Sequence, residues 1–335
     1  MSNLDHTFYI DANGNSEQRL RYLNCYERAV YFYYRNKYLL KYDAFHLFIY
    51  NYLPVVEISN DKIIDILGNP PSKTIPCNVE LSYISKNLSD MIDLVKKGEY
   101  VAFKTSDADV PFSNVYKKYD ADESDFGDYY LVIETTDDYF YLPLYLHNDY
   151  ERLYHYNKNI SYVHWNDMKE AFDKQIEIYR FVHNGLTEKP VNEIHHELFN
   201  DLFQSYSLSE KKSDSILYYG TACIDVLLDH FANESLNLND TVGGKTLYRK
   251  LKACILQTIG KRQVLKECLE TTCKTKYEGI IHKIISVINA YITLISVLEV
   301  EYMKKNMVLG KRYIKSLEEI RWSENEMKHA LCDYV

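Results

Sequence analysis

The spacing of hydrophobic residues changes along this chain, and that change limits the folds the chain can adopt. Between residues 100 and 146, aromatic and aliphatic residues form short runs bounded by turn residues, as in β-strands. We predict strands over 100–104, 129–134 and 139–146. After about residue 190 the apolar residues recur at helical spacing, and no further strand is predicted. The sequence therefore predicts an α+β first part and an all-helical second part.

Predicted helices flank the strands and fill the second part. In the first part they cover 24–42, 61–67 and 88–97, and another begins at 166. In the second part they cover 191–206, 213–232, 245–258, 261–271, 278–306 and 314–331. Polar residues and the pair Asn184-Gly185 interrupt the pattern between the two parts. We therefore predict two domains, 1–190 and 191–335.

Charge and cysteine usage exclude several classes of protein. The net charge of −9 argues against nucleic acid or an anionic membrane as the main partner. The seven cysteines are odd in number and scattered, and none forms a C-x-x-C pair, so we expect neither a disulfide framework nor a zinc site. We expect no metal and no cofactor. The first residues carry no signal-peptide pattern, which predicts a cytoplasmic protein.

One uncharged apolar stretch, 284–298, invites comparison with a membrane span. It is shorter than the roughly 20 residues that a helix needs to cross a bilayer. Ser286, Asn289, Thr293 and Ser296 recur within it at helical spacing and form a polar stripe. We therefore predict the central helix of a water-soluble bundle, with no membrane contact. The helix at 278–306 is also the candidate for a homodimer interface.

The sequence Gly243-Gly244-Lys245-Thr246 ends like a phosphate-binding loop. Asn239 stands where the first glycine of that motif belongs, and no strand is predicted before it. We therefore interpret these residues as a turn at the start of a helix.

Cys25 is the candidate nucleophile. It lies at the start of the predicted helix at 24–42, where the positive end of the helix dipole lowers the pKa of a thiol and favours the thiolate. A helix with a cysteine, followed by strands that carry a histidine and an acid, is the order in which papain-like folds assemble a catalytic site. The alternative is that Cys25 is a small buried hydrophobic residue.

Tyrosine is unusually frequent, at 33 of 335 residues, and it clusters at 31–38 and 129–162. One interpretation is an aromatic cleft for a ring-bearing or acyl ligand. The other is a strand-rich region that uses tyrosine for its β-propensity. Both interpretations stay open from the sequence.

Several blocks of sequence then match one family in order. Leu23-Asn24-Cys25-Tyr26-Glu27 opens an aromatic helix, and the strand at 100–104 is followed by 107–116 with Val110-Pro111-Phe112. A strand–turn–strand at 128–142 comes next, and then 160–171, 219–222 and 260–262. These blocks resemble the butirosin biosynthesis protein H-like (BtrH-like) family, from aminoglycoside and peptide-type biosynthetic clusters. The resemblance covers most of the chain.

The resemblance implies a papain-like cysteine acyltransferase domain with antiparallel strands, followed by a helical domain. Cys25 would take an acyl group from a thioester, on an acyl carrier protein or a small molecule, and pass it to an amine. The resemblance also implies that five residues bind the substrate: Asn24, Tyr26, Asp107, Tyr116 and Tyr129.

The sequence departs from the family pattern at the catalytic base. Gly127-Asp128-Tyr129-Tyr130 stands at the strand opening where family members keep a histidine, and Leu142-Pro143-Leu144 stands where the orienting acid belongs. Without an imidazole, general-base assistance of about 10²–10⁴ in rate is lost. His147, His155 or His46 could supply a base, and so could Asp128 if burial raised the pKa of its carboxyl.

Two functions therefore stay open. The first is a cysteine-dependent acyltransferase or amide-forming protein of specialised-metabolite biosynthesis, with Cys25 as nucleophile and Asp128 or His147 as base. The second is a catalytically degenerate papain-like protein that binds a ligand or partner through its tyrosine-rich lining.

Overall fold

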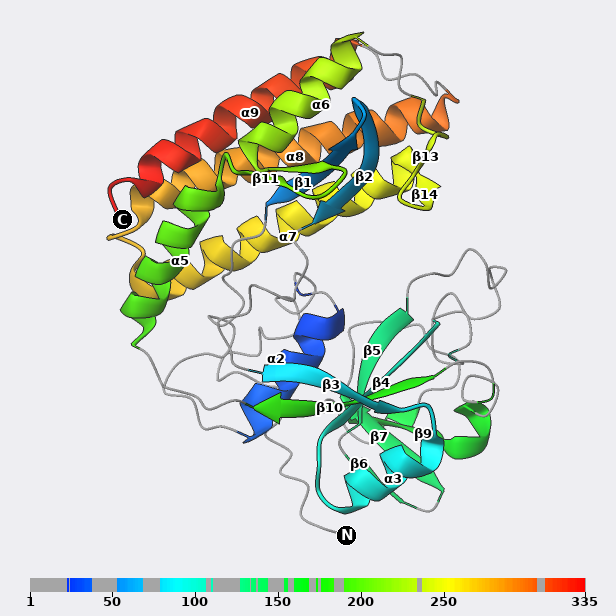
Figure 1. Ribbon diagram of the computed structural model, residues 1–335. Coiled ribbons are helices and arrows are strands. Elements are labelled where there is room, and N and C mark those ends of the chain that lie inside the picture. Colours follow the sequence, from blue (N-terminus) through cyan, green and yellow to red (C-terminus); the bar gives the residue numbers. More distant parts are fainter. Residues whose placement is uncertain are drawn as a thin grey trace. The chain divides into compact units, whose positions relative to one another are not determined.

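A computed structural model describes the chain over residues 23, 25–37, 53–68, 79–106, 110, 127–132, 134–136, 138–143, 154–155, 160–168, 173, 176–183, 190–233, 237–305 and 311–334. The chain forms two compact units. The first comprises residues 1–44 and 77–188, and the second comprises 45–76 and 189–335. The predicted division at residue 190 differs from this arrangement, because 45–76 belongs to the second unit. In Figure 1 the blue strands β1 and β2 lie among the green-to-red elements of that unit.

An antiparallel sheet forms the centre of the first unit. Its strands follow the order β3 (Val79–Ser85), β10 (Glu177–His183), β4 (Val101–Ser106) and β5 (Gly127–Val132). Val101, Phe103, Leu131 and Ile178 are fully buried in it. β4 and β5 confirm two of the predicted strands, with their ends shifted by a few residues.

Helix α2 (Cys25–Lys37) covers one face of this sheet. Tyr33 of α2 stacks on Phe181 of β10 with ring centroids 4.5 Å apart, and Ala29 and Val30 are fully buried. Side chains alternate along a strand, so the register places Phe181 on the same face as Tyr179 and Tyr129. That face is the one that α2 covers.

A second antiparallel sheet and a short helix complete the described part of the first unit. The strand order is β6 (Glu134–Thr135), β7 (Tyr139–Pro143), β9 (Ile160–His164) and β8 (Tyr154–His155). β7 confirms the strand predicted from 139, and α3 (Leu88–Lys96) confirms the helix predicted at 88–97. Where a helix was predicted to begin at 166, the structure describes a single 3-10 turn, η5 (Trp165–Met168).

The second unit contains a sheet that was not predicted. β1 (Pro54–Ser59) and β2 (Lys62–Gly68) form a hairpin, and β1 also pairs with β12 (Ile216–Tyr219), which pairs with β11 (Ser209–Lys211). The helix predicted at 61–67 is wrong. Asn60 and Asp61 turn the chain with φ of 48° and 58°, left-handed values that these two residue types tolerate, and they start a strand instead. The prediction of an all-helical second part is also wrong, because β11 and β12 lie within it.

Long helices nevertheless dominate this unit. They are α5 (Val191–Ser205), α6 (Thr221–Asn233), α7 (Leu247–Cys273), α8 (Glu278–Met303) and α9 (Lys311–Leu331). α5, α8 and α9 confirm three predicted helices. Ion pairs join neighbouring helices: Lys252–Glu299 at 2.8 Å, Lys283–Glu326 at 2.7 Å and Arg321–Asp225 at 3.2 Å. These pairs and Figure 1 show that α8 runs antiparallel to both α7 and α9.

Two predicted helix boundaries in this unit are wrong. The helix predicted at 213–232 is split, because β12 occupies its first part and α6 begins only after Gly220. The two helices predicted at 245–258 and 261–271 are one continuous helix, α7, in which Gly260 is buried. Packing of α7 in the core outweighs the low helix propensity of a single glycine.

The glycine pair before α7 forms a hairpin turn between β13 (Thr241–Val242) and β14 (Lys245–Thr246). Gly243 and Gly244 have φ of 54° and 76°, which a two-residue hairpin turn requires. Thr246 then caps α7, because its hydroxyl accepts a hydrogen bond from the Arg249 N–H at 3.4 Å. The interpretation as a turn at a helix start is confirmed.

Helix α8 is the one described helix that is long and apolar enough to cross a membrane by length and composition alone. Of its most apolar window, 44% is buried inside the second unit, as happens in core helices of water-soluble proteins too. The predicted polar stripe of Ser286, Asn289, Thr293 and Ser296 lies on its exposed face.

Candidate functional site

The structure describes only part of the site predicted from the sequence. Asn24, Asp107, Tyr116, His147 and His46 lie outside the described residues. The backbone of Cys25, Asp128 and His155 is described, but not their side chains. Tyr26 and Tyr129 are described in full.

Cys25 is the first residue of α2. The first N–H groups of a helix have no partner within it, and they form the positive end of the helix dipole. A backbone N–H at this position can donate to an oxyanion, and the start of a helix generally lowers the pKa of a cysteine thiol. The backbone thus gives position 25 the setting that the sequence predicted for a nucleophile.

Tyr26 and Tyr129, two predicted substrate-binding residues, are in contact. Their ring centroids lie 5.6 Å apart in an edge-to-face arrangement. Tyr129 contacts Tyr179 at 5.4 Å, and Tyr179 contacts Tyr83 at 5.9 Å, so four tyrosine rings form a continuous row. We call these four residues the tyrosine row. It begins beside Cys25 and crosses β5, β10 and β3, where Tyr83 is 52% exposed.

Two charged residues that were not predicted lie against the tyrosine row. The Lys104 ammonium is 5.6 Å from the centroid of the Tyr129 ring, and the Tyr179 hydroxyl donates a hydrogen bond to Glu177 Oε2 at 2.5 Å. Glu177, Lys104 and Tyr129 are direct neighbours across β10, β4 and β5. Burial and the Glu177 carboxylate raise the pKa of Tyr179 well above its usual value, so Tyr179 stays a neutral donor.

The sequence could not show this grouping, because the three residues come together only through strand register. Lys104 and Glu177 are far apart in the chain, and although Lys104 lies in a predicted strand, no strand was predicted at Glu177. The one available signal was strand alternation. Every second residue of a strand lies on the same face of the sheet, but which residues of neighbouring strands share that face is known only from the pairing.

Asp128 occupies the position of β5 that pairs with Thr105 of β4. Successive residues of a strand belong to opposite faces, and Tyr129 lies on the face that α2 covers. Position 128 therefore belongs to the opposite face from the start of α2. The identity of the base stays a prediction, with His147, His155 and His46 as the other candidates.

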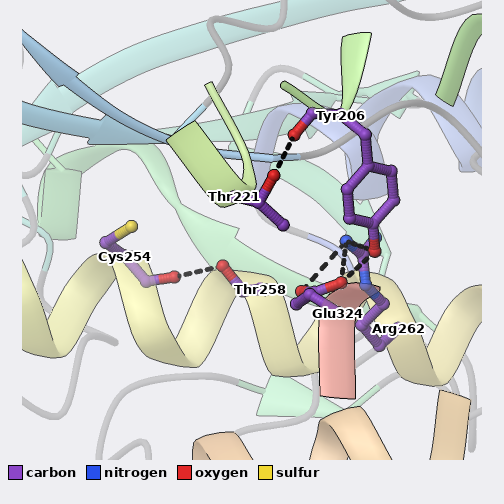
Figure 2. Close-up of polar contacts among 6 residues, drawn as sticks. All are labelled: Tyr206, Thr221, Cys254, Thr258, Arg262 and Glu324. Carbon is purple, nitrogen blue, oxygen red and sulfur yellow. Dashed lines mark hydrogen bonds and ion pairs between the residues drawn. The ribbon is translucent and has the colours of Figure 1, made fainter. Parts of the chain in front are cut away.

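A second group of polar residues lies inside the second unit, where no site was predicted. Arg262 of α7 and Glu324 of α9 form an ion pair with both N–O distances at 3.3 Å, and each side chain is 2% exposed. The Tyr206 hydroxyl donates to Glu324 and accepts from Arg262. Figure 2 shows the three side chains converging from separate elements. We call Tyr206, Arg262 and Glu324 the buried triad.

Electrostatics fix the protonation states of two members of the buried triad, Tyr206 and Arg262. Burial and the neighbouring Glu324 carboxylate raise the pKa of Tyr206 far above its usual value. Burial opposes the charge of Arg262, but the combined effect of Glu324, Tyr206 and Tyr291 outweighs it and raises the pKa of the guanidinium. Arg262 thus stays charged while Tyr206 stays neutral. The buried triad is suited to fix α7 and α9 together.

Two cysteines of the second unit can be set aside as nucleophiles. Cys223 and Cys254 are buried, and burial raises the pKa of both thiols, that of Cys254 to about 12. Thiolate is the reactive form, so both are inert near neutral pH. Figure 2 shows the Cys254 carbonyl accepting a hydrogen bond from the Thr258 hydroxyl, at 2.8 Å.

No known family model matches the chain, and no curated protein matches it. Within the described residues there is also no group of three or more His, Cys, Asp or Glu side chains placed to hold a metal ion. Function must therefore be inferred from the geometry at α2 and the tyrosine row.

Proposed function

We propose that the chain is a cysteine-dependent acyltransferase or amide-forming protein of specialised-metabolite biosynthesis, papain-like and related to the BtrH-like family. The proposal rests on one observation above all: Cys25 begins α2, and the next residue, Tyr26, packs against Tyr129 at the start of β5. A helix-start cysteine on one element is thereby held next to an aromatic surface on another. An acyl carrier protein or a small-molecule thioester is the proposed donor.

We propose that the aromatic surface binds the acyl group of the donor. The tyrosine row offers ring faces and edges for the apolar part of an acyl group. Lys104, beside Tyr129, adds a positive charge on the same face of the sheet. A positive charge there attracts a negatively charged donor.

The proposed chemistry uses two exchanges at one carbonyl carbon. The Cys25 thiolate attacks the thioester, a new C–S bond forms, and the donor leaves as a thiolate that takes up a proton. An amine then attacks the acyl-Cys25 carbonyl, the C–S bond to Cys25 breaks, and a base removes the proton from the nitrogen. Neither exchange oxidises or reduces any group, so no cofactor is required.

The test is direct acylation of the intact protein. We expect benzoyl and octanoyl thioesters of N-acetylcysteamine to add a single acyl group, which intact-protein mass spectrometry detects and peptide mapping assigns to Cys25. The Cys25→Ala variant should lose the adduct. The matched control is the double variant Cys273→Ala/Cys332→Ala, which removes two exposed cysteines and should keep the adduct.

Two results would oppose acyl transfer. One is an adduct of the same yield on Cys25→Ala, and the other is no adduct with either thioester. Release of an amide from acylated protein on adding a primary amine would extend the result from acylation to transfer.

The tyrosine row also supports a second candidate function, a non-catalytic binding module. Its four rings, joined by three contacts, and the Lys104 ammonium form a recognition surface whether or not Cys25 reacts. This function predicts ligand binding that is lost in Tyr129→Ala and unchanged in Cys25→Ala. An acyl-Cys25 adduct would rule it out as the sole function.

A further inference from the structure

One face of α8 is exposed over four turns and carries no charge. Between 284 and 298 the helix has no Asp, Glu, Lys or Arg. Ile292, in the middle of this stretch and beside the exposed polar stripe, is 45% exposed. Val300 and Met303 continue the same face and are 37% and 73% exposed. Exposed helix faces of water-soluble proteins normally carry charged residues, so this face resembles one that a partner covers.

Three of the four polar side chains on this face make hydrogen bonds within their own helix. The hydroxyls of Ser286, Thr293 and Ser296 donate to carbonyls of their own helix at 3.2, 3.0 and 2.8 Å. A partner can therefore displace water from them without leaving unpaired donors. Their small size also allows another helix to approach the backbone closely.

Helix α9 adds a groove and an anchor beside this face. A hollow of about 510 Å³ lies between the two helices, lined by Asn289, Thr293, Lys315, Glu318, Glu319 and Trp322. Trp322 is 63% exposed, although an indole ring gains much from burial. Exposed tryptophans next to grooves are frequent anchors of protein–protein interfaces.

Charges of both signs line this groove. Lys315 is one helical turn from Glu318 and Glu319, and within the described part of the chain none of the three forms an ion pair. A two-fold interface places each residue of one copy against a different residue of the other. All three charges lie on α9, so a two-fold axis can place the lysine of each copy against the two carboxylates of the other.

We propose that the α8–α9 groove is the interface of a homodimer, in which Trp322 of each copy fills the groove of the other. Lys315 of each copy pairs with Glu318 and Glu319 of its partner, and the uncharged face of α8 is covered. A membrane is the less favoured occupant, because helices that lie on anionic bilayers carry Lys and Arg on their polar face, whereas this groove has two carboxylates. The proposal is independent of the acyltransferase function.

The first test is the mass in solution of the full chain. Light scattering after size exclusion should give twice 39.6 kDa at high protein concentration, with dissociation on dilution. Thr293→Arg places a long charged side chain in the groove and should give monomers. Thr271→Arg is the matched control: Thr271 is exposed on α7, its hydroxyl also donates to its own helix, and this variant should stay dimeric.

The second test exchanges the charges. Lys315→Glu should prevent self-association by like-charge repulsion, and so should the double variant Glu318→Lys/Glu319→Lys. An equimolar mixture of the two should form a heterodimer, because only the mixed interface pairs opposite charges. Circular dichroism on each variant checks that the helices are intact.

Three results would overturn the proposal. They are a wild-type monomer at every concentration, a Thr293→Arg variant that stays dimeric, and charge variants that fail to associate when mixed although the wild type dimerises. Flotation of monomeric wild type with vesicles of phosphatidylcholine and phosphatidylglycerol would assign the face to a membrane instead, and would also overturn it.

Discussion

Arg262 and Glu324 show at the residue scale how the second unit is held together. Both charges are removed from water, and they pair with each other and with the hydroxyl of Tyr206. A buried ion pair adds little net stability over a well-packed apolar pair of the same shape. Loss of one member is costly, however, because the other charge is left buried without a partner.

We therefore predict that Glu324→Ala lowers the free energy of unfolding by about 3–5 kcal/mol. The matched control is Asp225→Ala, which breaks the exposed Arg321–Asp225 pair and should cost about 0–1 kcal/mol. Urea unfolding followed by far-ultraviolet circular dichroism measures both, since the long helices of the second unit dominate that signal.

The double variant Arg262→Met/Glu324→Leu separates two explanations of a loss in Glu324→Ala. One is the uncompensated charge of Arg262, and the other is the loss of side-chain packing at position 324. If the cost of Glu324→Ala comes from an uncompensated charge, the double variant should recover most of the stability. A Glu324→Ala variant as stable as Asp225→Ala would contradict the role given to the buried triad.

At the scale of elements, the junction between β12 and α6 depends on one glycine. Gly220 has φ of 58°, and a Cβ there would collide with the carbonyl oxygen of Tyr206. That carbonyl is held in place because it accepts hydrogen bonds from the N–H and the hydroxyl of Thr221, at 2.9 and 3.0 Å. The Gly220 N–H in turn donates to Pro54 of β1 at 2.9 Å.

We predict that Gly220→Ala destabilises the second unit more than Gly244→Ala does. Both glycines have a left-handed φ, which costs an alanine about 1–2 kcal/mol, but a Cβ at Gly244 meets nothing within 4 Å. Gly220→Ala adds a backbone collision of about 1–3 kcal/mol. Thermal unfolding of the two variants gives the comparison, and equal losses would contradict the collision.

Helices and strands were predictable from the sequence where the pattern of their own residues specifies them. α3, α5, α8 and α9 have amphipathic or strongly apolar patterns long enough to specify a helix alone. The β1–β2 hairpin was missed although Asn60-Asp61 is a recognisable turn pair, because the aliphatic run after it suits a helix as well as a strand. β1 is fixed by pairing with β12, where Val55 lies opposite Tyr219, and no local pattern reports a contact so distant in the chain.

The candidate site, like the fold, was predictable from the sequence only in its local features. A cysteine at a helix start and tyrosines near it were found from the sequence, and Tyr26 and Tyr129 do meet. Lys104, Glu177 and Tyr179 join these tyrosines through the pairing of β10, β4 and β5. The sequence does not reveal how these strands pair, so it could not show that these residues lie together.

At the scale of the whole molecule, the two units are interleaved in sequence. The chain enters the second unit at residue 45, returns to the first at residue 77, and leaves it again after residue 188. A cut at residue 190 would therefore separate β12 from β1, the strand with which it pairs. Experiments on either unit require the full chain.

The functional account of the whole molecule depends on whether Cys25 is activated. Alkylation by iodoacetamide reports the thiolate, and peptide mass spectrometry follows every cysteine separately in the same sample. Cys273 and Cys332, which are exposed, serve as internal references in the intact protein. The measurement is the rate of alkylation at Cys25 as a function of pH.

If Cys25 is a nucleophile activated by its position at the helix start, its alkylation rate should reach half-maximum below about pH 7. A half-maximum at about pH 8.5 or above is that of an unactivated thiol. That result would contradict the acyltransferase and leave the tyrosine row as the surface of a binding protein.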